Sequence, residues 1–260
     1  MTTDGDLAAR QVVVSAGAIH SPAILLRSGC GERRSGVGAN LAEHPMVLGM
    51  LDLHPGVIDR DGDTPSTGFI LRWSSGVEGC GEGDLQIAPL NHNDPEVAGR
   101  ILVLVAVMEP FSRGAVTLAS DDPEVDPRID FRLLSDSRDE ARMRLATQEL
   151  FTLLQHAAIG AISGPAFLDE NGTTLADVAG ERAFDAWFAS SVRDYVHACG
   201  TCKMGSPDDP SAVVDPRCRF IGVENLAVVD ASVAPIIPRA NTHLTAVMIA
   251  ERAAAFLIGG

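Results

Sequence analysis

The sequence has 260 residues, of which 46% are hydrophobic and 21% charged, which is the profile of an ordinary globular protein. Its formal net charge is −15 with acidic residues scattered along the chain, so neither nucleic acid nor an anionic membrane is expected as a partner, because both require a cationic surface. The five cysteines form no even disulfide framework, residues 2–9 are too polar for a secretory signal, and the apolar runs are too short for a membrane span. We therefore expect a cytoplasmic protein with reduced thiols.

The start of the chain predicts one half-unit of a parallel α/β sheet. Residues 11–14 have the apolar character of a buried strand, and Ser15-Ala16-Gly17 predicts a turn. The apolar residues 23–26 then predict a helix that ends near Ser28-Gly29. A strand, a glycine turn and a helix are the repeating step of a parallel α/β sheet, so this segment belongs in such a sheet.

The middle of the chain predicts an antiparallel sheet with helices, an α+β layer. The expected strands cover residues 46–53, 69–73, 85–90, 101–108 and 115–118. An amphipathic helix is expected over 136–161, and one or two more helices over 175–189. Several strands in succession followed by helices are typical of an antiparallel layer, here inserted between parallel-type segments at the two ends of the chain.

The C-terminal stretch holds two histidines at junctions between a loop and a regular element. His197 lies in a loop, and His243 lies just before a helix predicted over 244–258, behind the good capping residue Thr242. Residues 226–229 predict a short strand between them. A loop and a helix start can present two imidazoles to one pocket, with the positive end of the helix dipole directed at negative charge there.

A set of motifs in order along nearly the whole chain carries a family resemblance. The motifs are residues 17–31 (GAIHSPAILLRSGCG), 37–45 (VGANLAEHP), 112–114 (SRG), 197–205 (HACGTCKMG), 229–232 (VDAS) and 238–245 (PRANTHLT). The chain resembles the C-terminal half of the glucose-methanol-choline (GMC) flavin oxidoreductases, and the mycofactocin-associated subfamily is one hypothesis for its place among them. It departs from the family in having Cys30 where an aliphatic residue is usual and in containing no Gly-x-Gly-x-x-Gly motif for the FAD pyrophosphate.

The resemblance implies a fold in three segments. Residues 1–45 would be part of a Rossmann-like FAD-binding domain, 46–190 a substrate-binding domain with an antiparallel sheet and helices, and 191–260 a return to the FAD-binding domain. The dinucleotide-binding unit that begins such proteins would be absent. A separate N-terminal FAD-binding polypeptide is therefore a candidate partner.

The resemblance also implies the chemistry, namely an FAD-dependent oxidoreductase that acts on the CH–OH group of a small alcohol. His197 would be the base that takes the hydroxyl proton, and His243 would hold the developing alkoxide while a hydride passes to the flavin. The positions that would contact FAD are Ala16, Gly17, Asp230, Ala231, Thr242, Leu244 and Thr245.

Two alternatives remain open from the sequence. The first is a truncated fragment of the family without catalysis of its own, because it would hold FAD poorly without the phosphate-binding unit. The second is a dithiol redox protein that uses Cys199 and Cys202. We expect no metal site, since these two cysteines lack a second ligand pair at suitable spacing, and both are then small buried side chains.

Overall fold

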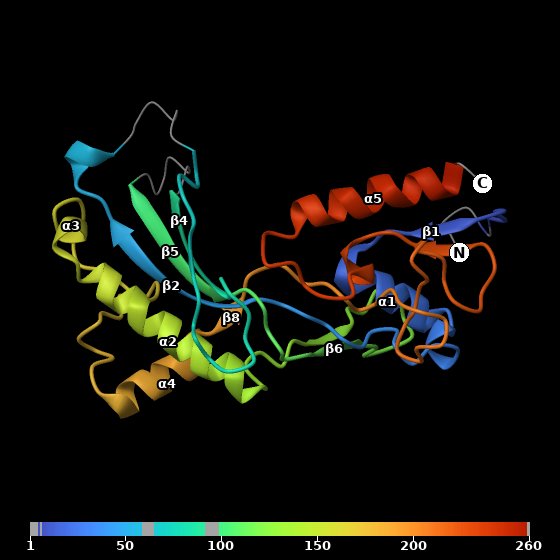
Figure 1. Ribbon diagram of the computed structural model, residues 1–260, viewed down its shortest axis with the longest axis horizontal. Coiled ribbons are helices and arrows are strands. Elements are labelled where there is room, and N and C mark those ends of the chain that lie inside the picture. The colour runs from blue at the N-terminus through green and yellow to red at the C-terminus, as the bar shows by residue number, and fades with distance from the viewer. Residues whose placement is uncertain (1–4, 6, 59–64, 92–98, 259–260) are drawn as a thin grey trace. The chain divides into compact units, whose positions relative to one another are not determined.

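The computed structural model describes residues 5, 7–58, 65–91 and 99–258, which Figure 1 draws as ribbon. Contacts divide the chain into two compact units. Unit 1 combines Met1–Glu43, Ser112–Arg132 and Val196–Gly260, and unit 2 combines His44–Phe111 and Leu133–Tyr195. Each unit is described by itself below.

Unit 1 contains the predicted strand, turn and helix at the start of the chain. Strand β1 (Val12–Val14) pairs in parallel with β9 (Leu226–Val228), and helix α1 (Gly17–Arg27) follows β1. Gly17 has a φ of +79°, a left-handed conformation that glycine adopts without a steric penalty. The two strands come from opposite ends of the sequence, so the prediction of parallel α/β segments at the two ends is confirmed at this pair.

Four short elements and a long helix complete unit 1. Strand β6 (Ala115–Thr117) pairs antiparallel with β7 (Arg128–Asp130), which the sequence did not predict. The 3-10 helices are η1 (Cys30–Glu32) and η4 (Ala231–Val233), and the last helix is α5 (His243–Ile258). The buried core of this unit includes Leu25, Val213, Val214, Val228, Val233 and Ile249.

Unit 2 is the antiparallel sheet with helices that the sequence predicts. Its strands are β2 (Pro45–Asp52), β3 (Leu71–Trp73), β4 (Leu85–Asn91), β5 (Arg100–Val107) and β8 (Arg193–Asp194), in the order β3-β4-β5-β2-β8 with every neighbour antiparallel. The helices are α2 (Ser137–Leu154), α3 (Ala157–Gly160) and α4 (Glu181–Ser191), with a 3-10 turn, η2 (Pro55–Val57). Helix α2 packs on β5 and β2, and Leu150, Val105 and Val47 are among the side chains fully buried there.

Two predicted helices are shorter in the structure. The helix expected over 136–161 breaks at His156, which has an extended backbone. Its imidazole Nδ1 accepts from the Ala158 N–H and so caps the start of α3. The helix expected within 175–189 begins only at Glu181, because Gly180 before it has a φ of +96° and does not belong to the helix. In the part of the chain that the structure describes, none of the helices has both the length and the apolar character that crossing a bilayer requires.

The segment 112–132 is placed differently from the three-segment division expected from the sequence. It lies in unit 1 with the two ends of the chain, whereas the sequence analysis included it in the middle segment 46–190. Backbone hydrogen bonds between Gly114 and Leu41 and from the Val116 N–H to the Gly38 carbonyl, with contacts between α1 and β6, hold it there. The cofactor and substrate roles assigned to the segments stay predictions.

A buried ion cluster joins helix α2 to the sheet of unit 2. The Arg142 guanidinium donates to Asp84 at 3.1 Å and to Asp139 at 2.5 Å, and all three side chains are fully buried. A third donation reaches the Glu109 carbonyl at 2.9 Å, and both Asp139 oxygens accept from the Phe111 N–H at 3.0 Å. The cluster therefore satisfies the buried charges with partners from three segments.

Arg142→Ala should lower the free energy of unfolding by about 3–5 kcal/mol, because it leaves two buried carboxylates without their cation. Arg144→Ala, two residues further along the same helix, is the matched control. Its partners Glu140 and Asp185 are about half exposed, so its loss should cost roughly 1 kcal/mol or less. Urea denaturation followed by circular dichroism measures both, and equal costs would show that the buried cluster contributes nothing beyond a surface ion pair.

Candidate functional site

The carboxyl ends of β1 and β9 bring four predicted cofactor residues together. Because the strands are parallel, the segments that follow them, with Ala16 and Gly17 after β1 and Asp230 and Ala231 after β9, leave the same edge. The Gly17 N–H donates to the Asp230 carboxylate at 2.9 Å across 213 residues of sequence. The structure therefore joins the two halves of this predicted set, at the edge where ligands of parallel α/β sheets bind.

The Asp230 side chain is fully used within unit 1. One oxygen accepts from Gly17 N–H and from the Ser21 hydroxyl, and the other accepts from Ser232 N–H at 2.8 Å. The carboxylate therefore sits at the start of α1 and also caps η4, where it satisfies backbone donors. Asp230 therefore links this edge of unit 1 to the start of α1, where its carboxylate accepts from the first N–H of the helix.

The loop that carries His197 runs alongside η4. Backbone N–H groups of Gly200, Cys202 and Met204 donate to carbonyls of η4, those of Ala231, Ser232 and Val233, at 3.2, 2.8 and 2.9 Å. Helix α5, which begins at His243, also contacts η4. Both histidine-bearing segments therefore pack against the same three-residue helix. Convergence of the two imidazoles on one substrate stays a prediction.

Three of the sequence motifs meet beside this loop. Leu41 pairs with Gly114, and Ala42 pairs with Cys199 through two backbone hydrogen bonds of 2.9 and 3.0 Å. The Arg113 guanidinium donates to the Asn40 side-chain oxygen at 3.2 Å, while the Asn40 amide donates to a carbonyl of the histidine loop. Motifs that lie more than 70 residues apart thus form one continuous support for His197.

His197 is a buried imidazole in a firmly held backbone. Its side chain and backbone together are 9% exposed, and burial lowers the pKa of the imidazole from its ordinary value. The His197 N–H donates to the Glu43 carboxylate at 2.7 Å. A neutral imidazole near pH 7 can accept a proton, so the surroundings suit the role of a base.

His243 has a different environment, because it is exposed at the first position of α5. Leu244 beside it is 76% exposed, and Thr242 and Thr245 are half-buried. The first N–H groups of a helix have no acceptor within the helix, so this end offers donors to an anion or an alkoxide. The structure thus places Thr242, Leu244 and Thr245 with His243 at an accessible helix start.

The residues present fit one part of an FAD molecule and not another. His243 is exposed at the start of α5, and an added Cβ at Gly17 would meet no atom within 4 Å, so a ligand can closely approach both positions. The pyrophosphate end lacks its cradle, because the sequence has no Gly-x-Gly-x-x-Gly and Asp230 occupies the start of α1. The chain therefore offers positions that a flavin could approach, and its sequence has no Gly-x-Gly-x-x-Gly cradle for the pyrophosphate.

The dithiol hypothesis is opposed by the burial of both sulfurs. Cys199 is 1% and Cys202 0% exposed, and burial raises the pKa of each thiol to about 12. The negative charge of Glu43 adds to the rise at Cys199. A redox pair needs an accessible thiolate, so these cysteines have the character of packed apolar side chains.

Sequence reasoning did not single out Glu43, Asn40 or Ser21 as site residues. Each holds a predicted site segment through a hydrogen bond: Glu43 at His197, Asn40 at Gly200 and Ser21 at Asp230. The sequence holds one sign of Glu43: it is an acidic residue that stands between the apolar pair Leu41-Ala42 and His44-Pro45. Its partner 154 residues away could not be known without the fold.

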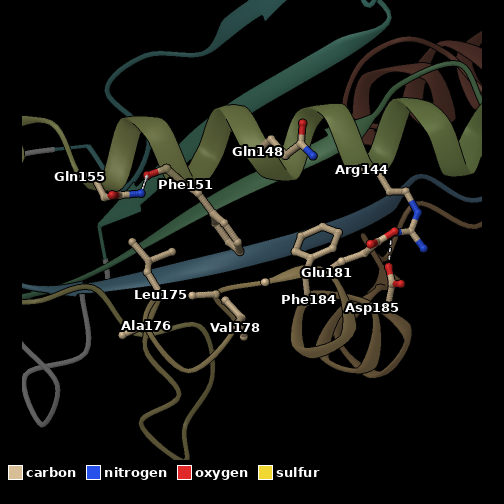
Figure 2. Close-up of a pocket in the computed structure, with 12 residues that line it drawn as sticks. Arg144, Gln148, Phe151, Gln155, Leu175, Ala176, Val178, Glu181, Phe184 and Asp185 are labelled. Atoms are coloured by element: carbon tan, nitrogen blue, oxygen red, sulfur yellow. Dashed lines mark hydrogen bonds and ion pairs between the residues drawn. The ribbon is translucent and has the colours of Figure 1, made fainter.

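An open groove in unit 2 of about 890 Å³ contains none of the predicted site residues (Figure 2). Figure 2 shows Phe151 of α2 and Phe184 of α4 pointing toward each other, with Leu175 and Val178 below them. At one end Arg144 is already paired with acidic side chains. Because none of the residues predicted to act on substrate or cofactor lines this groove, it is not the candidate site.

Comparisons with known proteins agree with the motifs. The family models described as GMC oxidoreductase match residues 2–46 and 110–250. The 5-(hydroxymethyl)furfural oxidase of Methylovorus sp. (strain MP688) is 36% identical over 95% of this chain and 50% of its own length, and the oxygen-dependent choline dehydrogenase of Rhizobium etli (strain CIAT 652) is 30% identical over 97% and 52%. Formate oxidase of Aspergillus oryzae RIB40, a protein studied for its FAD modification, shares the fold with a TM-score of 0.78 at 19% identity, over 97% of this chain and 55% of its own.

Native-state thiol labelling should distinguish the five cysteines. Cys80, the only one of the five that is not fully buried, should react with a thiol reagent at pH 8, whereas Cys30, Cys199, Cys202 and Cys218 should react only after denaturation. Mass spectrometry of the labelled peptides measures this. Rapid native labelling of Cys199 and Cys202 would revive the dithiol hypothesis.

Proposed function

The chain belongs to the GMC oxidoreductase family, and on that premise we propose that it forms the catalytic-histidine part of an FAD-dependent oxidoreductase acting on CH–OH groups. It spans about half the length of the curated relatives that it matches. One observation supports the proposal above the others: the His197 loop and helix α5, which begins at His243, both pack on η4, the segment that follows β9.

In this proposal His197 takes the proton of the substrate hydroxyl. Burial lowers the pKa of its imidazole, so the ring is neutral near pH 7 and has a nitrogen ready to accept. His243, with the N–H groups of the first turn of α5, holds the oxygen as negative charge develops on it. FAD, the cofactor named for the family's solved members, supplies the acceptor for the hydride when it is bound.

We further propose that a polypeptide carrying the dinucleotide-binding unit covers an exposed apolar face of unit 1. This face consists of Leu244, Val247 and Met248 on α5, which are 76%, 45% and 57% exposed and, at spacings of three and four residues, lie on one side of the helix. Val12 and Val13 on β1 are also exposed, by 49% and 46%. Apolar side chains this exposed on a strand and a helix are typical of a surface that meets another chain. The relatives have about as much sequence outside the matched region as within it, which is enough for such a unit.

A catalytically incompetent fragment is the second candidate. It is supported by the absence of Gly-x-Gly-x-x-Gly from the sequence and by the occupied start of α1. In this case the apolar face remains uncovered, and the histidines have no hydride acceptor. The two candidates differ in one property, which is whether a dinucleotide-binding partner restores bound flavin.

The substrate class proposed here is a small alcohol, as the names of the relatives suggest. One relative is named for 5-(hydroxymethyl)furfural and another for choline, which share only a primary alcohol. These two compounds are the first probes for activity. The mycofactocin-associated subfamily and a cytoplasmic location remain hypotheses from the sequence.

Flavin retention should depend on the exposed apolar face. The chain purified alone should lack the visible absorbance of flavin, and co-expression with the first half of the Methylovorus relative should yield a complex that retains it. Met248→Asp should abolish the complex without unfolding the chain, because it places a charge in an apolar contact. Val125→Asp, another exposed apolar residue of unit 1, is the matched control. Stoichiometric FAD in the chain alone would contradict this part of the proposal.

In the flavin-containing complex, His197→Ala should slow anaerobic flavin reduction by an alcohol roughly 10²- to 10⁴-fold, the contribution typical of a general base. Stopped-flow absorbance measures the rate. His20→Asn, an exposed histidine on α1, is the control and should leave the rate unchanged. A His197→Ala rate equal to that of the control would remove His197 from the reaction.

A further inference from the structure

The backbone on both sides of His197 is unusually constrained. Val196, the residue before it, has a φ of +60° although it is β-branched and 83% exposed. A β-branched residue in the left-handed region costs about 1–3 kcal/mol and persists only where the surroundings impose it. Exposed Val196 has no packing reason for this conformation, so the constraint comes from the residues that follow.

Those residues are held from two sides. Cys199 is paired with Ala42, and Gly200, with a φ of +88°, approaches Asn40 so closely that an added Cβ would lie 2.7 Å from its carbonyl oxygen. Between Val196 and Cys199, the His197 N–H is held by the Glu43 carboxylate at 2.7 Å. The strained residue Val196 therefore directly precedes His197, whose backbone N–H donates to the buried Glu43 carboxylate.

Glu43 is placed to act on the imidazole as well as on the backbone. It is 3% exposed, and one of its carboxylate oxygens lies within 4.8 Å of a ring nitrogen of His197. Three other groups bear on the local charge: buried His44 next in sequence, and Cys199 and Arg113, whose guanidinium lowers the pKa of the Cys199 thiol while Glu43 raises it. A carboxylate at this distance stabilises a protonated imidazole.

We propose that Glu43 is a positioning residue for His197: its carboxylate fixes the backbone of the histidine loop and its negative charge favours the protonated ring formed when the substrate hydroxyl gives up its proton. The proton moves from the hydroxyl oxygen to the imidazole nitrogen, and Glu43 stays ionised throughout. The importance of this arrangement for turnover rests on the proposed function. The contacts of the Glu43 carboxylate with the His197 N–H and with the His197 ring are present in this chain without any partner or cofactor.

The test is a histidine titration of the chain without flavin or substrate. Long-range proton–nitrogen spectra of protein with ¹⁵N-labelled histidine follow each imidazole, and the His197 signal is assigned by its loss in His197→Asn. Glu43→Gln keeps an oxygen that can accept the His197 N–H but removes the charge, so the pKa of His197 should fall by about one unit. Glu32→Gln, an exposed acid of the same unit, is the matched control and should leave it unchanged.

The backbone contact has its own readout. Hydrogen exchange of the His197 amide should be at least tenfold faster in Glu43→Ala than in Glu43→Gln, because alanine removes the acceptor. An unchanged pKa of His197 in Glu43→Gln would overturn the electrostatic part of the proposal, and equal exchange rates would overturn the backbone part. Neither result depends on FAD, so a failure of the flavin experiments would leave this inference standing, and the reverse also holds.

Discussion

The architecture of unit 1 depends on one carboxylate, that of Asp230. It accepts from a backbone N–H at the start of α1, from the Ser21 hydroxyl and from a backbone N–H of η4, and so it ties the beginning of the sequence to its end. Parallel pairing of β1 with β9 brings two strands together, but three residues on each strand give few hydrogen bonds. Hydrogen bonds to an ionised acceptor are stronger than neutral ones, and here they fix the geometry at the strand ends.

The segments that carry the two proposed catalytic histidines pack around this point. Asp230 caps η4, η4 accepts three backbone hydrogen bonds from the segment after His197, and α5 packs on η4 with His243 at its first position. The loop with Asn40 and Glu43 supports the histidine segment from the other side. A rigid frame of this kind can store the strain seen at Val196, because several independent contacts hold the neighbouring residues.

The sequence predicted the regular elements well where periodicity was strong. Local hydrophobic periodicity predicted four features: the strand over 11–14, the helix after Gly17, the long strands of unit 2 and the C-terminal helix. The sequence did not predict β7 and β8, because strands of three and two residues form through their partners and have no clear pattern of their own. It also did not predict the break before α3, where His156 is the N-cap. For the site, local patterns indicated His197, His243 and the glycine turn, whereas the roles of Glu43 and Ser21 depend on partners more than 150 residues away.

The two histidines differ in a way that suits a division of roles. His197 is buried, which lowers the pKa of its imidazole, and its backbone N–H is held by the Glu43 carboxylate. His243 is exposed, beside apolar side chains of α5 that are also exposed. In the proposed reaction the base must be positioned in advance, and in unit 1 the contact with Glu43 holds the backbone of His197. If another polypeptide covers the exposed apolar side chains of α5, as proposed, the same contact would also enclose His243, because it lies beside them at the start of the helix.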